Sequence, residues 1–555
     1  MRKKFANISN RIVLCLLALF LIPFSVKAQD TVYVSGGLSH EGLLNWPPVM
    51  YNSNSYLDLS VYYLHEAKSF RGLRASTRLE LTEWPLPGFT EEFKGHGVSH
   101  LSVEADFTWG SITLGDVYGQ FGSGMILNLY EDRALGVDGA LRGAKIEASP
   151  YKGVHLTALG GKQRRYWSCY TDQAWGWNYS QDAAMGIDAE IEIERWSKRM
   201  QEKDMSLHIG GSFVSKYEQP DTVYTYVNEQ WYRYHFPRWV GAGAVRAEWQ
   251  MKGVDIMVEY ARKANDPTAE NRFSYRDGEG LMVSASYSQK GLSVLAQIKR
   301  TDNLSFRSDR LKTGISGRLN LMPAFTQQHT YALAAHYPYA TQYANGEWAF
   351  QTEVRYTWPR KTRMGGRYGT TLKLSASHIR GLASEGSWAI NTRPEGEYYT
   401  DVNIELNKRL SKKWWLNAML MYQTCNQTVV EGEGGLIRSG IAVVDARVHV
   451  NNNVSMHGEV QYLYSPHFEG QWVMALYELS LYHHVTLSGE WQYNIGGGPA
   501  ANNEHFYTAT VTYTHNAHRL MAGYTKTQEG FNCSGGVCRY IPRQEGVCLS
   551  YNFTW

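Results

Sequence analysis

Hydrophobic and polar residues alternate along most of this chain with a period of two. Representative runs occupy residues 101–109, 187–194, 254–260 and 442–449, where every second side chain is apolar. Successive side chains of a strand point to opposite faces, so each run predicts a strand with one apolar and one polar face. The runs are about ten residues long, the length of a tilted strand that crosses a bilayer.

The connections between these runs alternate between short and long. Short turns recur, for example at 109–110, 251–253 and 451–453. The long links are 121–141, 164–182, 217–238, 264–277, 301–346, 381–395, 425–440 and 529–543. Short periplasmic turns and long extracellular loops are typical of outer-membrane barrels. Because every backbone polar group in lipid must be paired internally, such strands have to close on themselves.

The pattern predicts an all-β fold, a transmembrane antiparallel up-and-down β-barrel of about 24 strands, within a range of 22–26. The predicted strands are 31–42, 55–64, 70–82, 99–109, 111–120, 142–149, 153–163, 183–196, 204–216, 239–250, 254–264, 278–288, 291–302, 347–358, 369–380, 396–408, 413–424, 441–450, 453–464, 471–482, 484–494, 505–515, 519–528 and 544–555. The link 301–346 contains two strand-like pieces, 315–321 and 330–335, and counting both gives 26 strands.

The last strand ends on aromatic residues. Tyr551, Phe553 and Trp555 share one face of the run 547–555. A terminal strand of this kind resembles the signal by which the barrel-assembly machinery recognises its clients. The alternative is an amphipathic edge strand of a soluble sheet, and the many similar runs upstream favour the barrel.

The amino terminus predicts export. Basic residues precede an apolar run at 12–24, and small residues follow it, which is typical of a secretory signal peptide cleaved after Ala28. The domains are therefore a signal peptide, 1–28, and one barrel with long extracellular loops, 29–555. Few residues precede the strand at 55–64, so we expect no plug domain, and we expect no domain after the last strand.

Net charge and composition narrow the choice of partners. Removing the five basic residues of 1–28 leaves 50 basic and 52 acidic side chains, so no basic excess argues for nucleic acid. We expect outer-membrane lipid as the surroundings and no cofactor or metal. The 18 Trp and 38 Tyr residues fit aromatic girdles at the two membrane interfaces.

A glycine-rich stretch at 115–143 carries charges of both signs. Its charged residues are Asp116, Glu131, Asp132, Arg133, Asp138 and Arg142. One interpretation is a loop folded into the lumen as a constriction that sets selectivity. The other is an extracellular loop held by local salt bridges. The sequence leaves both open.

Two further features concern pairing and charge. Cys533 and Cys538 flank Gly-Gly in an exported chain, which favours a structural disulfide. Glu190, Glu192 and Glu194 fall on one strand face and predict an acidic row in the lumen that could favour cations.

Aromatic residues gather in two of the long links, at 166–179 and 231–234. Exposed aromatic rings can stack on sugars or anchor a partner. The alternative, which we favour, is that they belong to the girdle at the lipid headgroups.

Three segments carry a family resemblance. They are Gly-Gly-Val-Cys-Arg-Tyr-Ile-Pro at 535–542, Phe-Gly-Ser-Gly at 121–124 with Asp138 and Arg142-Gly143, and Tyr-Pro-Tyr-Ala-Thr-Gln at 337–342. Together they resemble an uncharacterised outer-membrane barrel family of the Bacteroidetes over nearly the whole mature chain. The resemblance implies location and fold, and it implies no catalytic residues.

These observations predict an integral protein of the cell outer membrane. The expected function is a porin-like or transport-associated channel for small polar solutes. The alternative is a surface-binding or scaffold barrel that serves a partner complex through its loops. No Ser, His and acid set stands out by spacing, so a barrel hydrolase is the least favoured hypothesis and we expect no enzyme.

Overall fold

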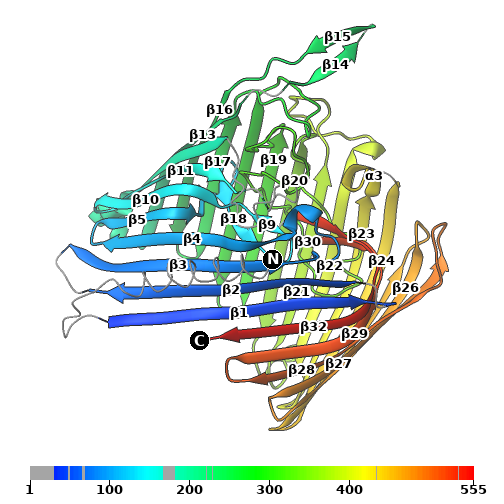
Figure 1. Cartoon of the computed structure of the whole chain (residues 1–555). Helices are drawn as coiled ribbons and strands as arrows, with labels where there is room; N and C mark the ends of the chain where they lie inside the picture. The colour runs from blue at the N-terminus through cyan, green and yellow to red at the C-terminus, as the bar shows by residue number, and fades with distance from the viewer. Residues whose placement is uncertain are drawn as a thin grey trace, which may run out of the picture.

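The computed structural model describes residues 31–47, 50–65, 69–164, 166, 182–219, 222–227, 229–432, 434–534 and 537–555. In this part of the chain, 24 strands form one closed antiparallel sheet (Figure 1). The barrel closes where the first strand pairs with the last, in a register that runs from Gly37 opposite Thr554 to Asn45 opposite Gly546. The predicted signal peptide lies outside the described residues.

The wall strands are β1 (Thr31–Asn45), β2 (Tyr51–Leu64), β3 (Phe70–Thr82), β4 (Gly95–Phe107), β5 (Gly110–Val117), β10 (Leu141–Tyr151), β11 (Val154–Gln163), β12 (Ala183–Glu192), β13 (Met205–Tyr217), β16 (Trp239–Met251), β17 (Val254–Lys263), β18 (Gly278–Gln289), β19 (Leu292–Asp302), β20 (Glu347–Trp358), β21 (Thr370–Arg380), β22 (Glu397–Arg409), β23 (Trp414–Asn426), β24 (Leu436–Asn451), β25 (Val454–Tyr464), β26 (Gly470–Leu481), β27 (Val485–Gly497), β28 (His505–His515), β29 (His518–Thr527) and β32 (Gln544–Thr554). Each predicted strand overlaps one of them, so the predicted fold class and strand number are confirmed.

The remaining elements are short and lie in the connections. The strands are β6 (Gly119–Gln120), β7 (Asn128–Leu129), β8 (Glu131–Asp132), β9 (Val137–Asp138), β14 (Tyr224–Val227), β15 (Gln230–Arg233), β30 (Gly530–Ser534) and β31 (Val537–Ile541). The helices are η1 (Glu91–Phe93), η2 (Ile193–Arg195), α2 (Lys198–Gln201), η3 (Pro394–Gly396) and α3 (Gln427–Val430). Within the described ranges, none of the helices has the length and apolar character needed to cross a membrane.

Several strand boundaries differ from the prediction by a few residues, and two of the differences have local reasons. The strand predicted at 183–196 ends at Glu192, because residues 193–195 coil into η2. The strand predicted at 441–450 begins earlier, at Leu436. Residues 436–440 lack the alternation that marks the rest of the strand, so the sequence pattern did not reveal them.

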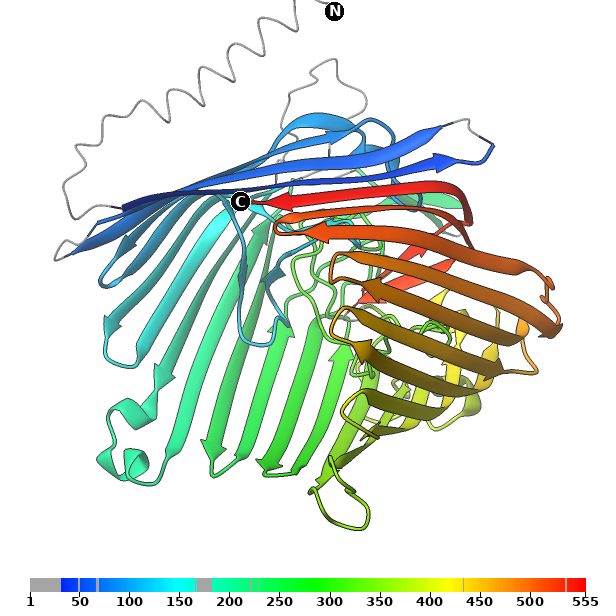
Figure 2. The same ribbon diagram turned by 90° about the horizontal axis from the view of Figure 1, so that it is seen from below.

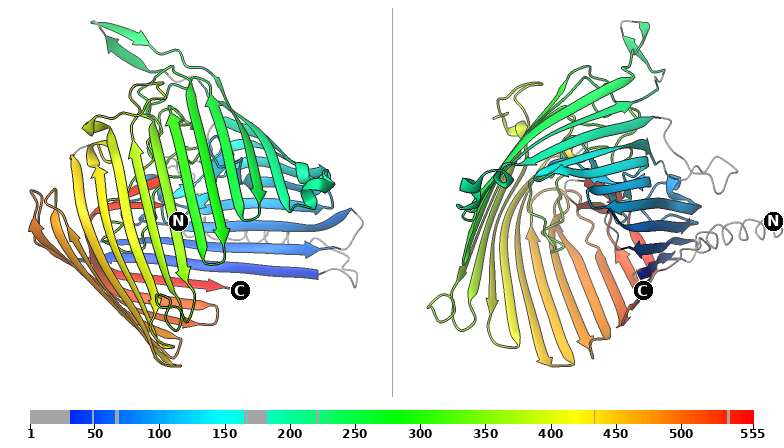
Figure 3. Two further views of the ribbon diagram at one scale, coloured as in Figure 1. Left: turned by 180° about the vertical axis from the view of Figure 1, so that it is seen from behind. Right: turned by 90° about the vertical axis from the view of Figure 1, so that its left-hand side faces the viewer.

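The wall is apolar outside and polar inside. Leu420 is 61% exposed and Val460 is 57% exposed, whereas the neighbouring Gln461 is fully buried in the barrel interior. This arrangement inverts that of a soluble protein and is the pattern of a barrel set in lipid. Figure 3 shows the tall wall strands from two sides.

Two connections turn into the barrel interior instead of staying outside it. They are residues 118–140, between β5 and β10, and residues 303–346, between β19 and β20, and Figure 2 shows both inside the ring of strands. The pieces 315–321 and 330–335 are therefore not wall strands. Their apolar residues Leu319 and Leu333 are fully buried within the barrel, which explains why they imitate a strand pattern.

Candidate functional site

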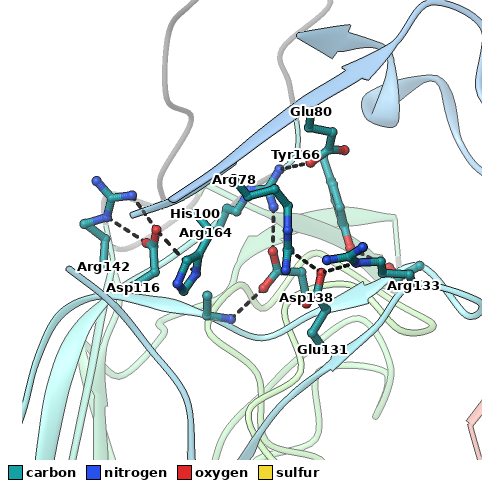
Figure 4. Close-up of polar contacts among 12 residues, drawn as sticks. Arg78, Glu80, His100, Asp116, Glu131, Arg133, Asp138, Arg142, Arg164 and Tyr166 are labelled. Carbon is teal, nitrogen blue, oxygen red and sulfur yellow. Dashed lines mark hydrogen bonds and ion pairs between the residues drawn. The ribbon is translucent and has the colours of Figure 1, made fainter. Parts of the chain in front are cut away.

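The candidate site is the lumen, and the 118–140 segment begins and ends at an ion pair in its wall, in which the Asp116 side chain is buried and the Arg142 side chain is 28% exposed. Asp116 on β5 and Arg142 on β10 are register partners, and the Arg142 Nε lies 2.7 Å from Asp116 Oδ1. A second guanidinium nitrogen lies 2.5 Å from Oδ2. The bidentate geometry fixes the two strands where the segment leaves and rejoins the wall (Figure 4).

A ring of four alternating charges attaches the middle of this segment to the wall. Glu131 accepts hydrogen bonds from Arg78 of β3 at 2.5 Å and from Arg133 at 3.2 Å. Asp58 of β2 accepts from the same two guanidinium groups, at 2.5 Å from Arg78 and 3.0 Å from Arg133. Arg133 also lies over the ring of Tyr56, 4.5 Å from its centroid. Each charged side chain in the ring therefore has two neighbours of opposite charge.

Asp138 ties the end of the segment to the next loop. It accepts hydrogen bonds from Arg164 at 2.5 Å (Figure 4), from the Tyr118 hydroxyl at 3.0 Å and from the Ala140 amide at 3.0 Å. Burial alone would raise the pKa of Asp138, but Arg164 and the amide lower it below its usual value. Asp132 instead accepts the Leu135 amide and stays within its own turn.

The tip of the segment reaches β17, the sixth wall strand after β5. The Ser123 amide donates to Glu259 of β17 at 2.8 Å. Gly122 has φ +51°, and a Cβ there would lie 2.7 Å from the Glu259 carboxylate oxygens. Phe121, Ile126 and Leu127 are buried around it. A glycine is thus required where the chain approaches that carboxylate.

The 303–346 segment pairs with the first one inside the lumen. The Asn128 amide donates to the Leu319 carbonyl at 2.8 Å, and the Leu321 amide donates to the Gly124 carbonyl at 3.2 Å. The Asn320 side chain donates to the Met125 carbonyl at 2.9 Å. The two segments therefore form one internal body.

Buried ions hold the start of the longer segment. Glu270, in the β17–β18 loop, accepts from Arg307 at 2.7 Å and from Arg318 at 3.2 Å. Burial would raise the pKa of Glu270, but Arg318 and Arg307 lower it to about 2. Arg310 pairs with Glu218 at 3.0 Å. These carboxylates come from neighbouring loops, so the segment is fastened to the rim as well as to the wall.

The rest of the longer segment crosses to the far wall, β22 to β26. It contacts polar side chains that point inward from those strands. The contacts are His329 to Asp401 at 2.6 Å, the Tyr331 hydroxyl to Asp445 at 3.2 Å and the Leu333 amide to Gln461 at 2.8 Å. The segment thus spans the lumen between opposite walls.

One group of lumen residues has the spacing of a metal site. Ligand atoms of Asp445, His457 and Glu459 lie within 4.8 Å of one another. The two His457 ring nitrogens already lie 2.9 Å from Asp445 and 2.8 Å from Glu478. Two of the three candidate ligands, His457 and Asp445, already contact each other, and Tyr331 also donates to Asp445, so the polar contacts of the wall account for the group without a metal.

The predicted acidic row, Glu190, Glu192 and Glu194, is divided between strand β12 of the wall and the turn that follows it. Glu190 on β12 lies 2.7 Å from Arg246, which also binds Asp188. Glu192 is the last residue of β12 and pairs with Arg195 at 2.5 Å. Glu194 lies in η2, beyond the strand, 3.1 Å from His208. Because the chain turns after Glu192, the three carboxylates do not form one lumen stripe.

The remaining predicted residues lie at the two ends of the barrel. The predicted disulfide is confirmed: Cys533 and Cys538 join β30 and β31. Tyr551 and Phe553 lie on β32, and the Trp555 amide donates to the Gly36 carbonyl at 3.0 Å.

The aromatic links are only partly described. Trp231 and Tyr232 lie on the β14–β15 hairpin, which projects beyond the rim in Figure 1, and Trp231 is 70% exposed. Residues 167–179 of the other aromatic link lie outside the described part of the chain.

Sequence reasoning missed the longer lumen segment and the wall partners of both segments. Arg78 and Glu259 occupy inward positions that alternation identifies, but their partners lie 53 and 136 residues away in sequence. The only local signal was the length of the link 301–346, since long ordered links are commonly functional.

Comparison with known proteins gives similar barrels at low identity. The siderophore receptor PirA from Pseudomonas aeruginosa aligns with a TM-score of 0.43 and 8% identity over 96% of this chain and 81% of the receptor. OccK3 from the same organism aligns with a TM-score of 0.37 and 12% identity, over 78% of this chain and 95% of OccK3. OccAB2 from Acinetobacter baumannii aligns with a TM-score of 0.36 and 9% identity, over 96% of this chain and 99% of OccAB2.

Sequence comparison gives a family. None of the curated proteins compared matches the chain. A Bacteroidetes source stays a prediction. Residues 17–555 match a family of unknown function, DUF6029, and the chain belongs to that family.

Proposed function

We propose that this protein is an outer-membrane channel for small polar solutes, narrowed by the 118–140 and 303–346 segments. The observation that carries the proposal is the internal body that these segments form across a polar lumen. A barrel of 24 strands is wide, so something must narrow it if the channel is to be selective. Catalysis forms no part of this proposal.

The apolar outer face supports the membrane location. Exposed leucine and valine side chains on wall strands are favourable in lipid and unfavourable in water. We propose that Tyr551, Phe553 and Trp555 act as the insertion signal read by the barrel-assembly machinery. Deleting Trp555 should reduce assembly in cells, and unchanged assembly would contradict that role.

Planar bilayers test the channel. Purified full-length protein should give stepwise conductance, and a variant that lacks residues 123–137 should give larger steps. A variant without the β14–β15 hairpin is the matched control, because that hairpin lies outside the lumen. Absence of conductance from both the full-length protein and the 123–137 deletion would refute the proposal.

The β14–β15 hairpin favours a second candidate function, a surface-binding barrel. Tyr224, Tyr226, Trp231 and Tyr232 are all exposed on this projecting hairpin. Exposed aromatic residues are common at the centres of protein interfaces. A partner that co-purifies with the full-length protein but not with the hairpin deletion, together with no conductance, would favour this function over the first.

A further inference from the structure

A cavity of about 780 Å³ lies at the end of the barrel that carries the long loops. Residues 332–338 of the longer lumen segment form one side of it. The other sides come from α3, the β25–β26 loop and the β29–β32 connection with its β30–β31 hairpin. This volume falls within the range of roughly 300–1,000 Å³ seen for small-molecule sites.

The cavity lining is rich in amides and aromatic rings. Gln492, Gln528 and Asn532 are among its amides, and Phe531 and Tyr540 are among its rings. Amides both donate and accept hydrogen bonds, so they suit ligands that present several hydroxyl groups. Aromatic rings offer flat apolar faces on which the C–H face of a sugar ring can stack.

Charge around the cavity disfavours anions. Its carboxylates are Glu431, Glu469 and Glu529, and no lysine or arginine is among the described residues that line it. All three carboxylates already have partners: Glu469 lies 3.0 Å from His336, Glu529 accepts the Tyr540 hydroxyl at 2.6 Å, and Glu431 accepts from the Gln427 side chain at 3.3 Å. The lining is therefore better suited to a neutral ligand than to a phosphate or a strongly basic one.

Two lining residues have buried polar atoms without a protein partner. The Tyr337 hydroxyl has none, although its side chain is only 3% exposed, and the Gln528 carbonyl oxygen has none either. Burial and the nearby charge of Glu469 raise the pKa of Tyr337, so its hydroxyl stays protonated and able to donate. Buried polar atoms normally have partners, and both of these atoms belong to residues that line the cavity.

We propose that this cavity binds a neutral, polyhydroxylated solute the size of a mono- or disaccharide. The inference deepens the proposed channel function by naming the class of solute. The Cys533–Cys538 disulfide closes the hairpin that carries Phe531, Asn532 and Tyr540, so it holds these lining residues in place before the solute arrives.

Calorimetric titration of the full-length protein in detergent tests the proposal. The probes are glucose, N-acetylglucosamine, maltose and sucrose as neutral sugars, glucose 6-phosphate as an anion and spermidine as a cation. We expect saturable binding of at least one neutral sugar and weaker binding of the charged probes. Phe531→Ala and Gln492→Leu should each weaken it by about tenfold. Tyr226→Ala is the matched control, because Tyr226 is an exposed aromatic on the distant β14–β15 hairpin.

Three outcomes would overturn the proposal. They are no saturable binding of any neutral sugar, preferential binding of spermidine or glucose 6-phosphate, and sugar binding that both cavity variants leave unchanged. Circular dichroism checks that the variants are folded. A barrel that binds sugar but never conducts would refute only the channel, whereas one that conducts but binds no neutral sugar would refute only this inference.

Discussion

The two lumen segments are held in different ways, although they form one internal body. The 118–140 segment is fastened by the ring of Asp58, Arg78, Glu131 and Arg133, whose side chains are 11% to 37% exposed, and at its end by Asp138, whose pair with Arg164 is buried. The 303–346 segment is fastened by ion pairs such as Arg310 with Glu218 that are almost fully buried. Water screens the ring and does not screen the buried pairs of either segment.

This difference indicates which part of the internal body is suited to move. Partly exposed ion pairs contribute little and weaken in salt, whereas breaking a buried pair leaves an uncompensated charge. We therefore expect the part of the shorter segment that the ring holds, near residues 131–133, to open more readily than the longer segment. The following changes test that expectation, from the largest effect to the smallest.

Asp401→Leu should have the largest effect, and it should fall on the longer segment. The substitution leaves both His329 and Asn403 buried without their Asp401 partner, which costs about 1–3 kcal/mol for each lost hydrogen bond. Hydrogen exchange of residues 326–340 should accelerate accordingly, while residues 118–140 keep their protection. Val402→Ala is the control, because Val402 is the next residue and lies on the outer face. Equal acceleration in both segments would show that they open as one unit.

Glu270→Gln should have an intermediate effect and remove a pH dependence. The pKa of Glu270 is about 2 in the folded protein, below its unfolded value of about 4.3. Its stabilising contribution is therefore complete above about pH 4.3 and is lost as the pH falls toward 2. The variant should lose about 2–3 kcal/mol of local stability at pH 7, because Arg307 stays buried.

Thermal unfolding between pH 2 and pH 5 measures this contribution. Acidification should destabilise the wild type more than the variant across this window. The same pH dependence in both proteins would mean that Glu270 does not hold the longer segment.

Arg133→Ala should have the smallest effect, about 1 kcal/mol, because the ring is partly exposed. Amide hydrogen exchange of residues 118–140 should accelerate slightly in the variant. In the wild type, 1 M salt should accelerate the exchange of the same residues by a similar amount. Arg195→Ala is the control, since Arg195 pairs with Glu192 at the turn after β12. A salt effect on 303–346 as large as that on 118–140 would remove the distinction between the segments.

The wall was predictable from the sequence because its signal is local. Alternation within runs such as 101–109 specifies a strand and its two faces without knowledge of any distant residue. Membership of an uncharacterised family is also confirmed, whereas its Bacteroidetes origin stays a prediction.

The contents of the lumen were not predictable in the same way. Glu131 binds Arg78 across 53 residues, and Leu333 binds Gln461 across 128 residues. The sequence near these residues therefore does not indicate the contacts. The pieces 315–321 and 330–335 also show apolar periodicity, because a buried internal segment needs apolar residues as much as a wall strand does. Periodicity indicates that one face of a segment is buried, but it does not indicate whether lipid or the protein interior covers that face.

Single-channel conductance tests the central claim that the two segments narrow the channel. Thr301 and Glu347 are register partners, as are Val117 and Leu141, so residues 304–345 or 119–139 can each be replaced by a short Gly-Ser turn. We predict that both variants conduct more than the wild type, with the larger increase for the loss of 304–345, which spans the lumen. Conductance that neither replacement changes would contradict the account.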